Sequence, residues 1–416
     1  MKFESYHFSE GLTKGISKLD WKRPTDIQFK SITSILEGED VLAVAQTGTG
    51  KTAAYAIPTV ELLEQINLKQ RRKDGLKCII LAPTHELVLQ IVEVLEQLCK
   101  YTSVSVVGLL GGEKYDNQVK ALNDRVDIAV ATPGRLFDLI HQGFVKTHRI
   151  RSLILDEADQ MLDLGFINDI RQLIRLLPSR RQTLFFSATI NDYIKKVAYS
   201  LVRQSAIRIQ ISPKNPIAGN IEHSVAFIEM DDKRFFLERL IKEHPENKIM
   251  VFVRTLVRAE RVYKAMERVG LACVLIHRDM EQEERVQNLE LFKEGVINVL
   301  ISTDVGARGL DIKDIIYVVN YDIPEPVETY VHRIGRTGRI RKKGFAVSFA
   351  SPHEKSLIRD IEEFIGEKIE RLAIEKEDYE ETILFSEEQG EDWKKLMELS
   401  HELEEKSKKK KNKKKK

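Results

Sequence analysis

The residue types needed to bind a polyphosphate occur together in one short segment. Residues 45–52 read AQTGTGKT and are followed by residues with helix-forming character. Glycines let backbone N–H groups wrap a polyphosphate, and a helix N-terminus adds partial positive charge. Lys51 can reach the outer phosphates, and the Thr52 hydroxyl can bind Mg²⁺. We favour this function over a glycine turn capped by Thr52, although Ala45 stands where the usual pattern has glycine. The candidate loop consists of Ala45, Gln46, Thr47, Gly48, Thr49, Gly50, Lys51 and Thr52.

A carboxylate cluster follows another apolar run. Residues 153–155 are apolar and lead into Asp156-Glu157-Ala158-Asp159. An acid at a strand end beside a phosphate loop can hold Mg²⁺, and a second can orient an attacking water. We therefore assign Asp156 to the metal and Glu157 to the water. Acids also favour helix starts, but that alternative does not explain their coincidence with Lys51 and Thr52.

Short apolar runs rich in Val and Ile alternate with longer stretches of helical periodicity, which predicts an α/β fold with parallel sheets. In open sheets of this kind, ligands bind beyond the carboxyl ends of the strands. The expected strands are 41–45, 78–82, 104–110, 127–131, 153–155, 183–186 and 207–211, then 224–228, 248–253, 273–276, 299–301, 316–319 and 345–349.

The runs form two halves with different polar residues, which predicts two similar domains. We expect a first domain at 1–211, a linker at 212–220 and a second domain at 221–372. Residues 373–405 are acidic and carry an apolar stripe from Trp393 to Leu403 at helical spacing. A helix docked on the second domain is favoured there over a partner-binding helix, which stays an alternative. Residues 406–416 are low in complexity and predicted to be disordered.

Charge is strongly segregated along the 416 residues, whose net charge is only +2. The segment 406–416 carries +9, the segment 375–405 carries −10, and residues 1–374 carry +3. Three widely spaced cysteines argue against disulfides and a zinc cluster, and favour a reducing cytoplasm. The first ten residues lack an apolar signal region, and no apolar run reaches the ~18 residues of a membrane span. We expect a cytoplasmic monomer that does not contact membranes.

The loop and the DEAD tetrapeptide together resemble the defining motifs of the DEAD-box family of ATP-dependent RNA helicases, and the likeness runs from Phe3 to about Gly366. The sequence from Asp156 to Thr189 looks most similar to the bacterial RhlE-like branch. Other family motifs match in order at Trp21, Pro24, Thr25, Ile27 and Gln28; at Pro83, Thr84, Glu86, Leu87 and Gln90; at Gly111, Gly112 and 132–135; at 187–189; and, in the second half, at 251–253, His277, Gln282, Arg285, 302–304, 308–311 and 332–339.

The resemblance implies two RecA-like domains with parallel sheets flanked by helices, joined by a short linker, and it implies ATP, Mg²⁺ and RNA as ligands. Residues 1–29 would form the adenine-reading segment, with Phe3, Arg23 and Gln28 as contacts. Asp311 would meet the ribose, and Arg336 and Arg339 would act as arginine fingers. Coupling of hydrolysis to domain movement would fall to Ser187, Thr189 and His332. RNA would contact Pro83, Thr84, Gly111, Gly112, Thr132, Gly134, Arg135, Gln282, Arg285 and Thr303.

Several of these residues have a structural alternative. Gln28 could be a solvated helix residue, Phe3 a core anchor, and Ser187 or Thr189 a helix cap. Residues 132–135 could be an ordinary turn with Arg135 exposed, and the arginines of 332–339 a solvated loop.

The favoured function is RNA-stimulated ATP hydrolysis coupled to local, largely sequence-nonspecific unwinding of short RNA duplexes. An ATP-gated RNA clamp or assembly factor needs the same residues, and a DNA helicase is disfavoured because the family's sugar contacts discriminate 2′-hydroxyls. The chain departs from the family at His85, Arg254, Arg278 and Gly306. We expect His85 to weaken one RNA phosphate contact and Arg278 to restore it. The acidic extension could bind a protein partner, and the lysine tail could hold RNA.

Overall fold

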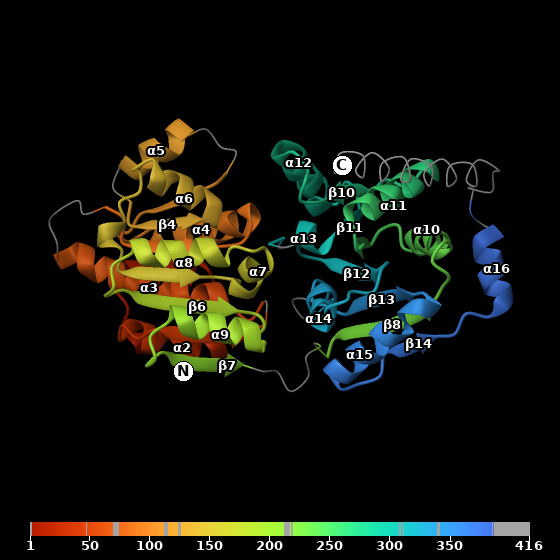
Figure 1. Ribbon diagram of the computed structural model, residues 1–416, viewed down its shortest axis with the longest axis horizontal. Coiled ribbons are helices and arrows are strands. Elements are labelled where there is room, and N and C mark those ends of the chain that lie inside the picture. Colours follow the sequence, from red (N-terminus) through yellow and green to blue (C-terminus); the bar gives the residue numbers. More distant parts are fainter. Residues whose placement is uncertain are drawn as a thin grey trace, which may run out of the picture. The chain divides into compact units, whose positions relative to one another are not determined.

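In the computed structural model the chain folds into two compact units (Figure 1). The first unit is Met1–Pro216 with Arg308–Asp311, and the second is Ile217–Ala307 with Ile312–Lys416. The described residues are 2–46, 48–69, 75–111, 115–123, 126–211, 217, 219–307, 309–310, 312–338, 342–384 and 386.

The first unit contains a seven-stranded sheet in which all neighbouring strands are parallel. Its strand order is β3-β4-β2-β5-β6-β1-β7. The strands are β1 (Val41–Ala45), β2 (Cys78–Leu81), β3 (Val106–Leu109), β4 (Ile128–Ala131), β5 (Ser152–Leu155), β6 (Gln182–Ser187) and β7 (Ile207–Ile211). The helices are α1 (Glu10–Lys18), α2 (Asp26–Leu36), α3 (Lys51–Lys69), α4 (His85–Cys99), α5 (Tyr115–Asn123), α6 (Pro133–His141), α7 (Ala158–Asp163), α8 (Ile167–Leu176) and α9 (Asp192–Leu201).

Helices cover both faces of this sheet, which explains why its central strands are continuous apolar runs. Successive strand residues point to opposite faces. Ile80 and Ile154 therefore pack with α1 to α4, whereas Ile79 and Leu153 pack with α6 to α9.

The second unit repeats this plan with a second seven-stranded parallel sheet, in the order β10-β11-β9-β12-β13-β8-β14. Helices α10 and α11 share a buried core with one face of it. The strands are β8 (Ile221–Phe227), β9 (Lys248–Phe252), β10 (Val274–Ile276), β11 (Val299–Ser302), β12 (Ile315–Asn320), β13 (Gly344–Ala350) and β14 (Glu370–Leu372). The helices are α10 (Lys233–Glu243), α11 (Leu256–Arg268), α12 (Gln282–Lys293), α13 (Asp304–Ala307), α14 (Val327–Ile334), α15 (Lys355–Ile365) and α16 (Lys376–Leu384).

The two parallel sheets flanked by helices confirm the predicted fold class. The sequence does not predict β14, an exposed edge strand that pairs with β8. The domain boundaries stay a prediction. The stripe from Trp393 to Leu403 and the lysine tail lie outside the described residues. Within the described part of the chain, no helix has the length and apolar character needed to span a membrane.

Helix α16 of the C-terminal extension contacts α10. The Tyr379 hydroxyl donates to Asp232 Oδ2 at 2.8 Å, and Arg239 donates to the Thr382 hydroxyl at 2.6 Å. The Ser386 hydroxyl, just beyond the helix, donates to Glu238. The described part of the extension is therefore held on the second unit by side-chain hydrogen bonds.

Candidate phosphate site and nucleic-acid contacts

The candidate phosphate loop, carboxylates and coupling residues follow three adjacent strands of the first unit. In the sheet, β6 lies between β5 and β1. Leu155 is in register with Phe185, and Val44 with Ser187. The carboxyl ends of these strands therefore meet at one sheet edge, where ligands bind in open α/β sheets.

The loop after β1 is closed by its own side chains. Lys51 is buried and its Nζ donates to the Ala45 carbonyl oxygen at 2.7 Å. The Thr49 hydroxyl donates to the Gln46 carbonyl oxygen at 2.7 Å. Gly48 and Gly50 have φ of 80° and 92°, a backbone region that favours glycine. The loop thus keeps a lysine amine at the N-terminus of α3, an arrangement suited to phosphate oxygens. Thr47 lies outside the described residues.

Gln28 connects the start of α2 to this loop. Its Oε1 accepts from the Thr25 backbone N–H at 3.0 Å, and its Nε2 donates to the Gly50 carbonyl oxygen at 3.1 Å. The Thr25 hydroxyl donates to the Thr49 carbonyl oxygen. A side-chain amide has a second N–H and further lone pairs, so these bonds are compatible with reading a base.

The other two predicted adenine contacts lie in different environments. Phe3 is buried in the hydrophobic core, as its structural alternative states, and Arg23 is exposed. Their roles at adenine stay predictions.

The two predicted catalytic carboxylates are both buried. Asp156 Oδ1 accepts from the Glu157 backbone N–H at 2.9 Å, and Oδ2 accepts from the Tyr55 hydroxyl at 2.8 Å. Burial raises the pKa of Asp156, and the charge of Lys51 acts against this increase. Glu157 has φ of 48° and ψ of 48°, which is uncommon for a residue other than glycine. Backbone strain of this kind clusters at functional sites.

The oxygen ligands at this site suit Mg²⁺ better than a metal that is held entirely by protein side chains. Among the described residues no group of three or more His, Cys, Asp or Glu side chains could hold an ion. Mg²⁺ is usually bound through one or two carboxylates together with substrate phosphates and water. Asp156 supplies a carboxylate and Thr52 supplies a hydroxyl oxygen, and both hydrogen-bond Tyr55.

Asp159, to which the sequence assigns no role, contacts the predicted coupling segment. Its Oδ2 accepts from the Ala188 N–H at 3.1 Å, from the Thr189 N–H at 2.8 Å and from the Thr189 hydroxyl at 2.8 Å. The Ser187 hydroxyl donates to the Thr189 carbonyl oxygen. Neither side chain caps α9, because Asn191 does so.

Most of the predicted RNA contacts in the first unit lie at strand ends and helix starts beyond β2 and β4. Thr84 caps α4 and accepts from the Leu87 N–H. Thr132 precedes α6, and Gly134 is exposed in its first turn. Pro83 is buried beside the Thr84 cap. The first backbone N–H groups of α4 and α6 therefore lie at the same edge of the sheet, because β2 and β4 are neighbouring parallel strands.

Two predicted contacts of the first unit have structural partners. Arg135 is buried, not exposed, and its Nε donates to Gln118 Oε1 at 3.0 Å. A Cβ on Gly111 would lie 3.2 Å from His85 Nε2, so the departure at His85 packs against that glycine. Gly112 lies outside the described residues.

Two of the predicted contacts in the second unit, Arg285 and Thr303, are hydrogen-bonded to the backbone. Arg285 is buried and donates to the carbonyl oxygens of His277 at 3.2 Å and Gly306 at 2.9 Å. The Thr303 hydroxyl accepts from the Gly306 N–H. Gln282 is the first residue of α12. A Cβ on Gly306 would lie 2.5 Å from the Ile276 carbonyl oxygen, which explains why glycine stands there.

Arg333 joins three segments of the second unit. It is almost fully buried and pairs with both carboxylate oxygens of Asp304, at 2.6 Å and 2.7 Å. It also donates to Asn320 Oδ1 and to the Asp322 carbonyl oxygen. His332 precedes Arg333 on α14, and Arg336 follows the end of that helix; both are partly buried. Asp311 and Arg339 lie outside the described residues.

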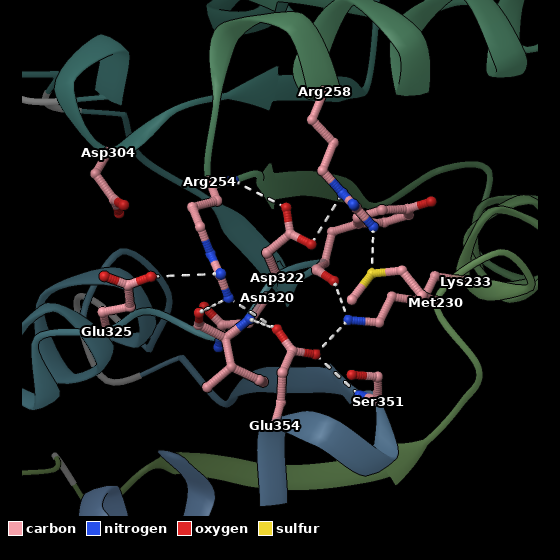
Figure 2. Close-up of polar contacts among 12 residues, drawn as sticks. Met230, Lys233, Arg254, Arg258, Asp304, Asn320, Asp322, Glu325, Ser351 and Glu354 are labelled. Atoms are coloured by element: carbon pink, nitrogen blue, oxygen red, sulfur yellow. Dashed lines mark hydrogen bonds and ion pairs between the residues drawn. The ribbon is translucent and has the colours of Figure 1, made fainter. Parts of the chain in front are cut away.

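Arg254, another departure, belongs to a charged network at the ends of β9, β12 and β13 (Figure 2). It donates to Glu354 Oε1 at 3.0 Å and pairs with Glu325 at 3.4 Å. The fully buried Lys233 contacts Glu354 Oε2 at 2.7 Å. Arg254 therefore has ion-pair partners within the second unit, while its side chain stays exposed. Arg278 is exposed and pairs with its neighbour Asp279, so its compensation for His85 stays a prediction.

Two protein-family models of helicases match this chain, and related helicases align with most of its length. The model described as DEAD/DEAH box helicase matches residues 25–197, and that described as helicase conserved C-terminal domain matches residues 232–341. An ATP-dependent RNA helicase CshA of Listeria monocytogenes is 38% identical over 371 residues, covering 89% of this chain and 70% of its own. The DEAD-box ATP-dependent RNA helicase CshA of Bacillus subtilis is 38% identical over 372 residues, covering 89% and 74%. These relatives do not confirm the RhlE-like branch.

Solved structures with the same fold include two with nucleic acid and nucleotide bound. S. cerevisiae Dbp5 bound to RNA and ADP BeF3 has a TM-score of 0.81 and 28% identity, covering 92% of this chain and 98% of its own. Mss116p bound to ssRNA and AMP-PNP has a TM-score of 0.80 and 29% identity, covering 93% and 82%.

Proposed function

The chain belongs to the DEAD-box family of ATP-dependent RNA helicases, and from this premise we propose that it couples ATP hydrolysis to local separation of short RNA duplexes. The observation that carries the coupling is the Asp159 carboxylate, which accepts three hydrogen bonds from Ala188 and Thr189. This contact joins the carboxylate segment after β5 to the segment after β6.

The phosphate site would act mainly by positioning and by neutralising charge. Lys51, now bonded to Ala45, would move its amine to the outer phosphates. Thr52 and Asp156 would hold Mg²⁺, which when bound would neutralise charge on the phosphate oxygens. Glu157 would orient the attacking water. We assign Arg336 and Arg339 to the charge that develops during transfer.

Recognition of the nucleotide base would use the amide of Gln28, which keeps a second N–H for an acceptor. Its bond to Gly50 would make base recognition sensitive to the position of the phosphate loop. Phe3, Arg23 and Asp311 are the remaining assignments by family likeness.

RNA would be held through its sugar-phosphate backbone. The N-termini of α4 and α6, at Thr84 and Thr132, offer N–H groups and partial positive charge to phosphates. Such contacts carry no base information, so binding would be largely independent of sequence. Arg135 and Arg285, both buried and hydrogen-bonded, would mainly hold the loops that make these contacts.

The remaining assignments rest on the sequence. We propose a monomer that works in the cytoplasm; the three free, buried cysteines support a reducing compartment. The C-terminal extension would bind a protein partner or RNA.

The test is the rate of ATP hydrolysis without nucleic acid, with single-stranded RNA and with DNA of the same sequence, alongside separation of a short RNA duplex. We expect stimulation by RNA and much less by DNA, together with strand separation. Absence of RNA stimulation would overturn the proposal. Stimulation without strand separation would favour an ATP-gated RNA clamp.

A further inference from the structure

Tyr55 contacts both residues assigned to the metal but has no role so far. It lies in α3, three residues after Thr52, so the two side chains share one face of the helix. Its side chain is fully buried, and its ring packs edge-on against Phe186 with centroids 5.2 Å apart. The ring therefore has one position, and the hydroxyl is aimed at Asp156.

The Tyr55 hydroxyl links two oxygen groups. It donates to Asp156 Oδ2 at 2.8 Å, and the Thr52 side chain also hydrogen-bonds it. The hydroxyl is the donor in its bond to Asp156, and the carboxylate is the acceptor.

This hydrogen bond leaves Asp156 able to bind a cation. An ionised carboxylate has about four lone-pair positions, of which Tyr55 takes one on Oδ2 and the Glu157 N–H one on Oδ1. The bond therefore fixes the carboxylate orientation without consuming its capacity. Outer partners that orient metal ligands typically change metal affinity 10- to 100-fold when they are lost.

We propose that Tyr55 is a positioning residue that sets the Mg²⁺ requirement of nucleotide binding by holding the Asp156 carboxylate in its ligating orientation. The proposal rests on the assignment of Thr52 and Asp156 to the metal within the proposed function. It does not depend on RNA or on strand separation.

Tyr55→Phe removes only the hydroxyl and keeps the packed ring. The experiment measures binding of a fluorescent ATP analogue to the full chain without RNA, in EDTA and across a Mg²⁺ titration. We expect the Mg²⁺ concentration for half-maximal tightening to rise about 10-fold, with affinity in EDTA unchanged. Equal weakening in EDTA and in Mg²⁺ would overturn the proposal, because it would indicate a purely structural effect.

Tyr379→Phe is the matched control, since it also removes a tyrosine hydroxyl that donates to an aspartate at 2.8 Å, but in the second unit. It should leave the Mg²⁺ titration unchanged. In an Asp156→Asn background, adding Tyr55→Phe should cause no further shift. An additional shift there, or a Tyr55→Phe titration that matches wild type, would also overturn the proposal. Loss of RNA-stimulated hydrolysis in wild type would instead count against the proposed function alone.

Discussion

Asp159 accepts two hydrogen bonds from Thr189, one from the backbone N–H and one from the hydroxyl, each at 2.8 Å. The two residues follow adjacent strands, β5 and β6, and β6 also pairs with β1, which precedes the phosphate loop. A movement of the carboxylate segment after β5 would therefore be transmitted directly to the segment after β6. This pair is the structural basis for assigning Thr189 to coupling.

Thr189→Val tests this assignment, because it removes the hydroxyl and nearly keeps the shape. A hydrogen bond to a charged group contributes about 1.5–3 kcal/mol, so we expect duplexes separated per ATP hydrolysed to fall roughly 10-fold or more. Hydrolysis should be retained, since Lys51, Asp156 and Glu157 are unaltered. Strand displacement and phosphate release are measured together.

The control for this variant is Thr382→Val, which removes another bonded threonine hydroxyl on α16. It should leave the ratio of separation to hydrolysis unchanged. A wild-type ratio in Thr189→Val would remove the hydroxyl from the coupling mechanism.

The stability of the second unit should depend on the ionisation of Glu354, and therefore on pH. Burial acts to raise the pKa of Glu354, but hydrogen bonds from Lys233 and the Ser351 N–H outweigh it and lower the pKa from its ordinary value of 4.5. The lowered pKa contributes stability that is fully present above 4.5 and is lost as the pH falls through the folded-state value.

Glu354→Gln leaves the fully buried Lys233 without its carboxylate partner. Breaking a buried pair on one side costs about 3–5 kcal/mol, so we expect the free energy of unfolding of the second unit to drop by this amount near neutral pH. The difference from wild type should shrink in acid, where Glu354 itself becomes protonated. Urea unfolding followed by amide hydrogen exchange in β9 and β12 measures both.

Glu363→Gln provides the comparison, since Glu363 lies exposed on α15, the helix that Glu354 immediately precedes. It should change the stability little at any pH. An equal loss in both variants, or a Glu354→Gln loss that does not vary with pH, would contradict the proposed role of the Lys233 pair.

The sequence predicts the two sheets and the phosphate site because both have local signals. Apolar runs bounded by polar clusters mark the central strands. The residues of the phosphate loop are consecutive in the chain, and so are Asp156 and Glu157. Strand β14 has no such signal, since Glu370–Leu372 contains one apolar residue and pairs through its backbone at the sheet edge.

Side-chain partners could not be predicted, because they come from distant segments that only packing brings together. Tyr55 and Asp156 are 101 residues apart, and Asp159 and Thr189 are 30 apart. The sequence suggests either an RNA contact or an exposed turn residue at Arg135, yet packing buries its side chain against Gln118. The positions of chemical groups are thus partly predictable, whereas the network that orients them is not.

The lysine tail gives a prediction that depends on charge alone. Residues 406–416 contain nine lysines and no acid. If all nine met phosphates of single-stranded RNA, deleting them would reduce the slope of log affinity against log salt by up to ~6. Replacing the lysines with serine, which keeps the length, should have the same effect. An unchanged slope would assign the tail no role in RNA binding, and the acidic segment should mask part of the effect at low salt.

The most direct test of the account is strand separation of a short RNA duplex by Glu157→Gln and wild type at saturating ATP, with hydrolysis measured in the same reaction. We expect the variant to bind ATP and RNA but to lose hydrolysis by ~10²-fold or more, the usual contribution of an acid-base group, and with it repeated strand separation. Wild-type hydrolysis and separation in Glu157→Gln would contradict the assignment of the buried carboxylate pair to catalysis.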